Sequence, residues 1–462
     1  MSDSAPTNTG RRTIDVDERL PILQTLPLSL QHLFAMFGAT VLVPILTGFD
    51  PSVALFSGGV GTLLYIAATK GKVPAYLGSS FAVIAGLATV NKGWGDPHAA
   101  MTGALALGLV YVCVSLLIGR IGIGWLDRIF PPVVIGSVVI VIGLGLASIA
   151  VQMAGLSANP RIPAGMESKW LLTAAFTVAV VVLGSCWFKG FLGVIPVLIG
   201  IVSGYVFGLV MGLVDFSKVT AAAWLDVPRF VTPAFSEKGL KAAVLIAPIA
   251  LVLITEHIGH LLVTNKIVDR DFTKDPGLHR SLLGDGLACT FASLVGAPPA
   301  TTYGENLGVM AITRVFSVWV LGGAALIAIS LSFIQKLGAL IQTIPEAVMG
   351  GVSIALFGVI AAAGTRLFVE AKVNFSEKRN LMLASVIMVL GVGGSKVHLG
   401  DFARPDDAGD AGGRRAEPDP AAGGCATERR RRQALRASCR PVIRRRTSRP
   451  PSPRPWSASR PC

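Results

Sequence analysis

Residues 243–263 read AVLIAPIALVLITEHIGHLLV, an apolar stretch nearly long enough to cross a bilayer, and Glu256 lies inside it. A second carboxylate, Glu305, lies in GAPPATTYGENLGVMAIT (296–313), where a Pro/Gly/Thr-rich break precedes an apolar run. An ionisable group at membrane depth is energetically expensive, so it usually faces a cavity and handles substrate or protons. These two stretches predict a membrane transporter.

The composition is that of a membrane protein. Of 462 residues, 52% are hydrophobic and 15% charged, with a mean hydropathy of +0.64, whereas soluble domains carry about 25% charged residues. Residues 1–20 are polar, so no cleavable signal peptide is predicted. The six cysteines show neither CxxC nor metal-site spacing, so neither a disulfide framework nor a zinc site is implied.

Apolar segments of roughly 20 residues recur along most of the chain, as expected of a polytopic helical membrane protein. The predicted fold class is therefore an all-α polytopic membrane protein. We predict thirteen spans, at residues 26–47, 51–69, 74–90, 99–118, 131–151, 170–188, 191–213, 241–264, 281–297, 299–313, 315–334, 340–363 and 380–394.

Two of these segments are interrupted. Residues 74–90 (PAYLGSSFAVIAGLATV) and 299–313 (PATTYGENLGVMAIT) each begin with Pro-Ala, continue through a Gly/Ser/Thr-rich run and end in a brief helical pattern. Irregular backbone at membrane depth is tolerated only where it lines a protein-enclosed cavity. Broken segments in corresponding positions of two halves are the sequence feature that best indicates a transporter's binding site.

The two halves of the chain correspond in order. The Gln-His pair at 31–32 and the Glu-His pair at 256–257 lie 225 residues apart, as do the Pro-Ala pairs that open the broken segments. Later, PPVVIGSVVI (131–140) matches PEAVMGGVSI (345–354) at an offset of 214. The pattern predicts a seven-plus-seven repeat, inverted because seven crossings are an odd number.

The charge distribution orients the predicted helices. With a cytoplasmic N-terminus, most Lys and Arg of residues 1–400 fall on the cytoplasmic side, in agreement with the positive-inside rule. Residues 401–462 break the pattern, because they are rich in Arg, Pro, Ala and Gly and contain no apolar run of spanning length. The fourteenth helix that the repeat requires is missing. We interpret this tail as an out-of-frame reading of the gene's end, with a disordered basic tail or a nucleic-acid-binding tail as alternatives.

Four stretches carry a family resemblance: LPLSLQHLFAMFGATVLVP (26–44), GKVPAYLGSSFA (71–82), ITEHIGHL (254–261) and TTYGENLGVMAITR (301–314). They resemble the nucleobase–ascorbate transporter family, and within it the bacterial uracil–proton symporters. The family signature is an acid or amide followed by N-x-G-x-x-x-x-T-R-x-x-G. Its last glycine is Ser317 here, and the rest is met by Glu305, Asn306, Gly308, Thr313 and Arg314.

The resemblance implies a division into two domains. A core domain would comprise spans 1–4 (26–118) and 8–11 (241–334), and a gate domain would comprise spans 5–7 (119–213) and 12–14 (340–400, lacking the fourteenth). Residues 1–25 would form a cytoplasmic N-terminal segment. The substrate would lie between core and gate, against two short antiparallel strands from the third and tenth spans. A homodimer through the gate domain, in the lipid bilayer of the cell inner membrane, is also implied.

The resemblance further assigns the substrate site. Glu256 and Glu305 would accept hydrogen bonds from the N–H groups of uracil. Backbone N–H groups at Phe81 and Gly304 would meet a carbonyl of the ring, and Tyr303 would line the pocket.

Proton coupling is assigned by the same resemblance to Glu256, His260 and Glu305, with the proton as coupling ion and no other cofactor. Relatives that carry oxidised purines usually have Gln at the position of Glu305, so Glu favours uracil. Xanthine, uric acid or another nucleobase is the alternative substrate.

The residue types fit this chemistry independently of the family resemblance. Uracil has two N–H donors and two carbonyl acceptors, which two carboxylates and two backbone donors would satisfy. Burial favours the protonated form of a carboxylate, so such a group can carry the driving proton. Glu256 and His260 are four residues apart and share a helix face. Packing for Phe81 and Tyr303, a bracing role for His32, and a hydrogen-bonded interhelical role for His260 are the structural alternatives.

The EHIGH stretch (256–260) also suggests a different class of protein, because it places one Glu and two His within five residues. An intramembrane metalloprotease would use the order H-E-x-x-H, but Thr255 stands at the first His position, and His257 and His260 are three residues apart. We therefore predict neither catalytic nor metal-binding residues. A passive channel is disfavoured by the carboxylates at membrane depth. Five polar residues near span ends are predicted to be solvated or to cap helices: Asp96, His98, Asp127, Asp226 and Asp285.

Overall fold

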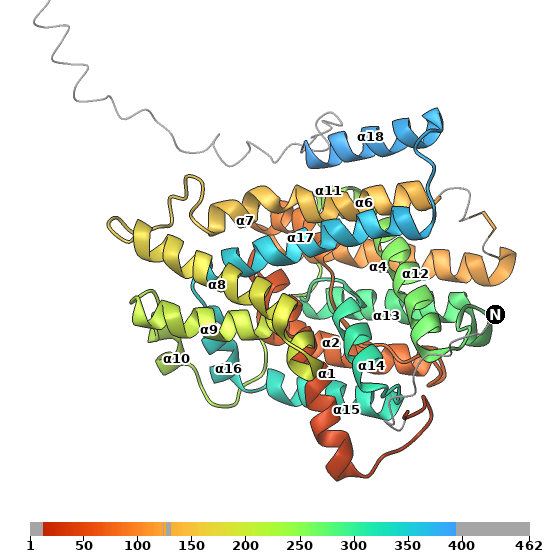
Figure 1. Ribbon diagram of the computed structural model, residues 1–462, viewed down its shortest axis with the longest axis horizontal. Helices are drawn as coiled ribbons and strands as arrows, with labels where there is room; N and C mark the ends of the chain where they lie inside the picture. The colour runs from red at the N-terminus through yellow and green to blue at the C-terminus, as the bar shows by residue number, and fades with distance from the viewer. Residues whose placement is uncertain (1–12, 123, 126–130, 394–462) are drawn as a thin grey trace, which may run out of the picture. The chain divides into compact units, whose positions relative to one another are not determined.

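The computed structural model describes residues 13–122, 124–125 and 131–393, and nearly all regular structure in them is helical (Figure 1). Two short strands are present, β1 (Leu77–Ser79) and β2 (Ala300–Thr302). The 3₁₀ and π segments are η1 (Phe81–Val83), η2 (Thr89–Gly93), η3 (Gly190–Val194) and η4 (Thr273–Gly277). The α-helices are α1 (Ile22–Thr47), α2 (Pro51–Ala68), α3 (Ile84–Ala88), α4 (Pro97–Ile121), α6 (Pro132–Gly145), α7 (Ala147–Met153), α8 (Glu167–Trp187), α9 (Pro196–Val210), α10 (Ser217–Ala221), α11 (Glu237–Ile246), α12 (Ile249–Val268), α13 (Leu278–Val295), α14 (Gly304–Thr313), α15 (Val318–Ser332), α16 (Gln335–Gln342), α17 (Glu346–Glu370) and α18 (Lys378–Val392).

Seven helical stretches in the described part are long and apolar enough to cross a membrane, and the bent pair α15–α16 is an eighth candidate, with 84° between its halves. The all-α polytopic fold is thus confirmed. Fewer helices than the thirteen predicted spans reach full length, because some spans are interrupted or short; α9 and the segment Phe81–Gly93 are examples. The missing fourteenth helix and the tail at 401–462 lie outside the described residues.

Local sequence explains where several helices begin. Asp50 caps α2 by accepting a hydrogen bond of 2.9 Å from Ser52 N. Asp96 caps α4 in the same way, accepting from Ala99 N at 2.9 Å. A proline follows each of these aspartates, and proline suits the first helical position because its missing N–H would be unpaired there. Asp96 is therefore a capping residue as predicted, whereas Asp127 lies outside the described residues.

The two interrupted segments meet in a short antiparallel ladder. Its register runs from Leu77 opposite Thr302 to Ser79 opposite Ala300. Strand β1 leads through η1 into α3, and β2 leads into α14. The predicted pair of short antiparallel strands in the third and tenth spans is confirmed, and each strand delivers the chain directly to the start of a helix.

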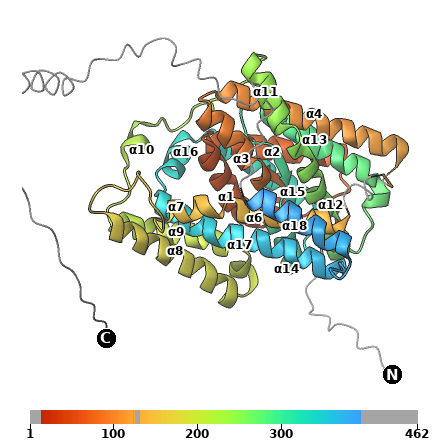
Figure 2. The same ribbon diagram turned by 90° about the horizontal axis from the view of Figure 1, so that it is seen from above.

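The helices pack in two groups. One group, here called the strand-bearing group, contains both strands together with α1–α4 and α11–α15; α13 packs on α2 and α4, and α15 packs on α1 and α2. The other, the flanking group, contains α6–α9, α17 and α18, with α17 packed on α6, α7, α8 and α9. Figure 2 shows α8 and α9 on the opposite side from α4 and α11. The groups meet where α1 contacts α9 and where α12 contacts α6.

An unpredicted strap precedes the first helix. Residues 13–19, here called the N-terminal strap, lie along residues 314–318 and exchange main-chain hydrogen bonds of 2.9–3.0 Å with them. Val16 is fully buried. Asp15 forms an ion pair of 2.6 Å with Arg270, just beyond the end of α12. The strap therefore joins the ends of α12 and α14, the two helices that carry Glu256 and Glu305.

Candidate substrate site

Glu256 lies in the middle of α12 and faces the start of the half-helix that follows β1. Its Oε2 accepts a hydrogen bond of 3.2 Å from the hydroxyl of Ser80. The same hydroxyl oxygen caps η1 by accepting a hydrogen bond of 3.2 Å from Ala82 N. Glu256 is partly buried, and the hydrogen bond from Ser80 anchors its carboxylate to the start of η1.

Glu305 lies in the first turn of α14, directly after β2. A carboxylate in the first turn is favoured by the partial positive charge at a helix N-terminus. Its side chain is partly buried, and it directly follows Gly304, which lies against the ring of His260, one turn beyond Glu256 on α12. The structure thus brings the two predicted carboxylates to one place, although their positions are 49 residues apart in the sequence.

Two helices, η1 and α14, begin at the ladder between β1 and β2. The ladder between β1 and β2 is extended by the hydrogen bonds Ser80 N to Pro299 O and Tyr303 N to Tyr76 O, each 3.0 Å. Phe81 begins η1 and Gly304 begins α14 immediately after these bonds. The first N–H groups of a helix have no partner within the helix, so both starts present main-chain donors.

Phe81 and Tyr303 are both buried, and the side chain of each contacts a neighbouring helix or strand. The ring of Phe81 packs edge-on against Phe357 of α17, with centroids 6.1 Å apart, so the site lies where the two helix groups meet. The Tyr303 hydroxyl donates to Ser79 O at 3.1 Å and lies 3.3 Å from the hydroxyl of Thr40 on α1.

Gly78 explains how the Tyr303 ring can cross β1. A Cβ atom at Gly78 would lie 2.5 Å from the ring, which is too close for any other residue type. The glycine in the AYLGSS stretch is therefore required by the close approach of the ring and not by backbone conformation.

His260 lies one turn beyond Glu256 and connects α12 to β2. Its Nδ1 is 3.2 Å from the hydroxyl of Thr302. A Cβ atom at Gly304 would lie 3.3 Å from its Nε2, so that nitrogen faces the start of α14. No hydrogen bond between His260 and Glu256 is present in the described part of the chain. His260 is thus beside the carboxylates without touching Glu256.

A buried polar network that no sequence pattern predicted lies next to the candidate site. Asp285, which was predicted to be solvated or capping, is fully buried in α13, so that prediction is wrong. Its Oδ2 lies 2.8 Å from Nδ1 of His257 and accepts a hydrogen bond of 3.0 Å from Tyr111. Nε2 of His257 lies 2.8 Å from the hydroxyl of Ser281, which lies 2.6 Å from the hydroxyl of Tyr65.

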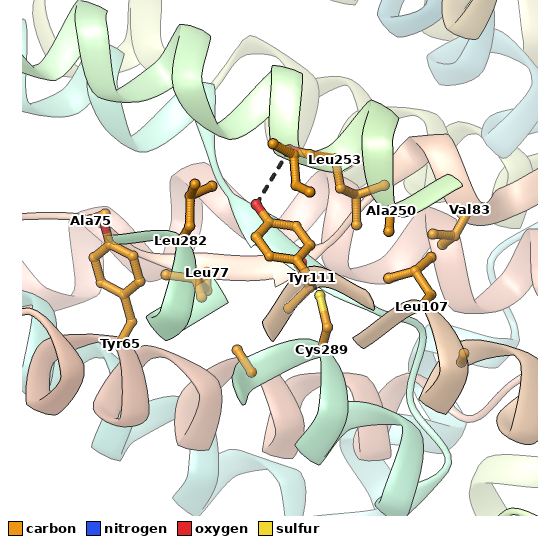
Figure 3. Close-up of a cluster of buried hydrophobic side chains, with 14 of the residues drawn as sticks. Tyr65, Ala75, Leu77, Val83, Leu107, Tyr111, Ala250, Leu253, Leu282 and Cys289 are labelled. Carbon is orange, nitrogen blue, oxygen red and sulfur yellow. Dashed lines mark hydrogen bonds between the residues drawn. The ribbon is translucent and has the colours of Figure 1, made fainter. Parts of the chain in front are cut away.

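Tyr111 joins this network to α12 as well. Figure 3 shows its hydroxyl directed at the carbonyl of Leu253, with an oxygen–oxygen distance of 3.4 Å, within an otherwise apolar cluster. The signal that could have identified Asp285 is the rule already applied to Glu256: an acidic residue within an apolar segment needs an explanation.

His32 has a bracing role in the structure. Its side chain is almost fully buried. The amide nitrogen of Asn306 lies 3.1 Å from both Nδ1 and the carbonyl oxygen of His32, which ties α1 to α14. Asn306 follows Glu305, so this contact fixes the first turn of the helix that carries the second carboxylate.

The EHIGH stretch does not form a metal centre in the described residues. Both ring nitrogens of His257 face partners in the protein, and no group of three or more His, Cys, Asp or Glu suited to a metal ion occurs in the described part.

A bundle of apolar helices with two broken segments, whose helices begin beside two carboxylates, is the architecture of a membrane transporter. The profile of the Permease family matches residues 23–400, and the chain belongs to this family, the nucleobase–ascorbate transporters. The prediction of a transporter and not an enzyme is thereby confirmed.

Several curated relatives match most of the chain. The uracil permease of Bacillus subtilis (strain 168) is 52% identical over 376 residues, which cover 80% of this chain and 86% of the relative. That of Paenibacillus larvae is 50% identical over 396 residues, covering 85% and 92%. That of Escherichia coli (strain K12) is 50% identical over 392 residues, covering 84% and 89%.

Solved transporters share the fold at low identity. The transmembrane domain of the cyanobacterial bicarbonate transporter BicA has a TM-score of 0.62 and 16% identity, covering 81% of this chain and 98% of that domain. The murine anion transporter Slc26a9 has a TM-score of 0.59 and 12% identity, covering 82% and 66%. These similarities support the architecture alone.

Proposed function

We propose that the chain imports uracil across the cell inner membrane by proton symport. The observation that carries the proposal is the convergence of Glu256, Glu305 and the helix starts at Phe81 and Gly304 on one site. The identity of 50–52% to uracil permeases selects uracil among the nucleobases.

Complementary hydrogen bonding supports uracil as the substrate. The ring presents two N–H donors, which match the acceptor oxygens of Glu256 and Glu305. Its carbonyl oxygens match the main-chain donors at Phe81 and Gly304, where the positive ends of two helix dipoles add to the attraction. A ring bound in this way would leave few buried polar groups unpaired, which favours binding over solvation in water.

The two aromatic residues differ in their proposed contact with uracil. Phe81 lies at the helix start and against α17, so its ring would border the substrate on the side of the flanking group. Tyr303 lines the pocket mainly through its backbone, because its hydroxyl is already engaged with Ser79 and Thr40.

Charge repulsion supplies a physical basis for proton coupling. Two ionised carboxylates at one site repel each other, so a proton on Glu256 or Glu305 stabilises the pair. His260 lies one turn from Glu256 and beside the start of α14, where it would exchange that proton. In this account the proton is the coupling ion, and no other cofactor is required.

The proposed transport cycle needs two parts that move relative to each other. We assign the strand-bearing group to the core domain and the flanking group to the gate domain, with the substrate between them. The apolar side chains exposed on α8, α9 and α18 would face lipid, or the gate domain of a second copy in a homodimer. A cytoplasmic N-terminus follows from the positive-inside rule.

Competition for labelled uracil uptake tests the substrate assignment. Cells that lack their own uracil permease would express the protein and receive an excess of unlabelled uracil, thymine, xanthine or uric acid. We expect uracil to compete strongly and the oxidised purines weakly. Stronger competition by xanthine or uric acid than by uracil would replace uracil as the proposed substrate.

A further inference from the structure

A small cavity adjoins the substrate site between α2, α12, α14 and the chain that leads into β1. It has room for about one water molecule. The side chains in its wall that carry polar atoms include Tyr65, Tyr76, His257, His260, Thr302 and Asn306.

Two of these side chains have polar atoms without a partner. Tyr76 is fully buried, and its hydroxyl makes no hydrogen bond to any described residue. Asn306 is 1% exposed, and its Oδ1 likewise has no partner in the described part of the chain. Its amide nitrogen is committed to His32, with two contacts of 3.1 Å, and this fixes which end of the amide is the free acceptor. Buried polar atoms are nearly always paired with protein or ordered water.

The two unpaired atoms define the chemistry of the occupant. Asn306 Oδ1 only accepts, so the occupant must donate a hydrogen bond; the Tyr76 hydroxyl both donates and accepts. A water molecule satisfies both, and the wall also contains the polar side chains of Thr302 and His260. The wall contains no carboxylate among the described residues, so a metal cation is a poorer match.

We propose that this cavity is a binding site for a single water molecule that bridges the hydroxyl of Tyr76 and Oδ1 of Asn306. The water completes a link from His32 on α1, through Asn306 on α14, to the segment before β1. A bridging water of this kind is nearly as favourable as a direct hydrogen bond. Because Asn306 follows Glu305, the bridge positions the carboxylate that the proposed function assigns to uracil binding.

The site itself is tested by a structure of the purified wild-type protein at a resolution that shows ordered water. We expect one peak at about 2.7–3.0 Å from both Tyr76 Oη and Asn306 Oδ1. The absence of a peak within hydrogen-bonding reach of both atoms would overturn the proposal. A peak at this position with the shorter distances and higher coordination number of a metal ion would also overturn the proposal.

The positioning role is tested by Tyr76→Phe, which removes one hydroxyl and keeps the ring. Tyr205→Phe is the matched control, because its hydroxyl lies 2.8 Å from Thr343, outside the cavity. We expect Tyr76→Phe to weaken uracil binding roughly 2- to 10-fold, and Tyr205→Phe to leave it unchanged, with similar small losses of melting temperature. Equal uracil affinity in the two variants would overturn the positioning role. If the wild-type protein binds no uracil, the proposed function fails, while the wild-type structure still decides the water site.

Discussion

Neither Glu256 nor Glu305 forms an ion pair with a Lys or Arg in the part of the chain that the structure describes. Glu256 receives a single side-chain hydrogen bond, from Ser80, and Glu305 lies at a helix start. An arginine partner would occupy the acceptor oxygens and fix both charges. In the proposed function, the remaining carboxylate oxygens would accept hydrogen bonds from two N–H groups of a planar ring.

Replacing either carboxylate by its amide tests this role. Glu256→Gln and Glu305→Gln each substitute an NH₂ donor for an acceptor facing a substrate N–H. Losing one hydrogen bond to a charged group costs roughly 1.5–3 kcal/mol, about 10- to 100-fold in affinity. Calorimetric titration of uracil into purified protein measures the loss, with the exposed Glu370→Gln as control. Wild-type affinity in both site variants would show that neither residue contacts uracil.

The contribution of the buried Asp285 network to stability can be measured by substitution. Asp285→Asn keeps the side-chain size but can replace the acceptor oxygen shared by His257 and Tyr111 with an NH₂ donor, so we expect a loss of about 1–2 kcal/mol in stability. Thermal unfolding in detergent measures it, with the exposed Asp226→Asn as control. A double variant with His257→Asn should lose less than the sum of the single losses, because both residues belong to one network. Equal melting temperatures for Asp285→Asn and Asp226→Asn would contradict the account.

The sequence identified some site residues and not others for a physical reason. Glu256 was found because a charge interrupts an apolar run. Asp285 carries the same signal, but the predicted span began at residue 281, which placed the aspartate near an edge. Tyr65 and Tyr111, which belong to the same network, lie on other helices. No local sequence pattern indicates a contact between residues so far apart in the chain.

At the level of elements, the two broken segments were predictable because Pro-Ala, glycine and hydroxyl residues interrupt apolar runs at matching positions. Their pairing as an antiparallel ladder came from the family resemblance and is confirmed. The N-terminal strap was not predicted, because residues 13–19 are polar apart from Ile14 and Val16. The strap is held to residues 314–318 by main-chain hydrogen bonds, which any residue type can form. The side chains of residues 13–19 therefore do not indicate this contact.

The strap makes a testable contribution to stability. Val16→Asp would place a charge in a fully buried position, at a cost of about 3–5 kcal/mol if the strap stays bound. We expect the strap to detach instead, lowering both the melting temperature and uracil uptake. The control Thr13→Asp adds the same charge at an exposed position. If both variants behave like the wild-type protein, the strap does not hold α12 and α14 together.

At the scale of the whole molecule, the described helices form two groups, and the candidate site lies where they meet. Phe81, from the strand-bearing group, touches Phe357 on α17 of the flanking group. The apolar runs of the sequence predicted the helices but not this grouping, because an apolar run by itself does not show which other helix it packs against. The seven-plus-seven repeat stays a prediction, as does the assignment of the groups to core and gate.

The central claim is that a proton gradient drives uracil accumulation through this site. The most direct measurement is the uptake of labelled uracil into cells that lack their own permease, before and after a protonophore collapses the gradient. The account predicts that cells accumulate uracil above the external concentration and that the protonophore reduces the internal concentration to the external one. Accumulation that persists without the gradient would contradict proton symport, and uptake that never exceeds the external concentration would indicate a passive channel.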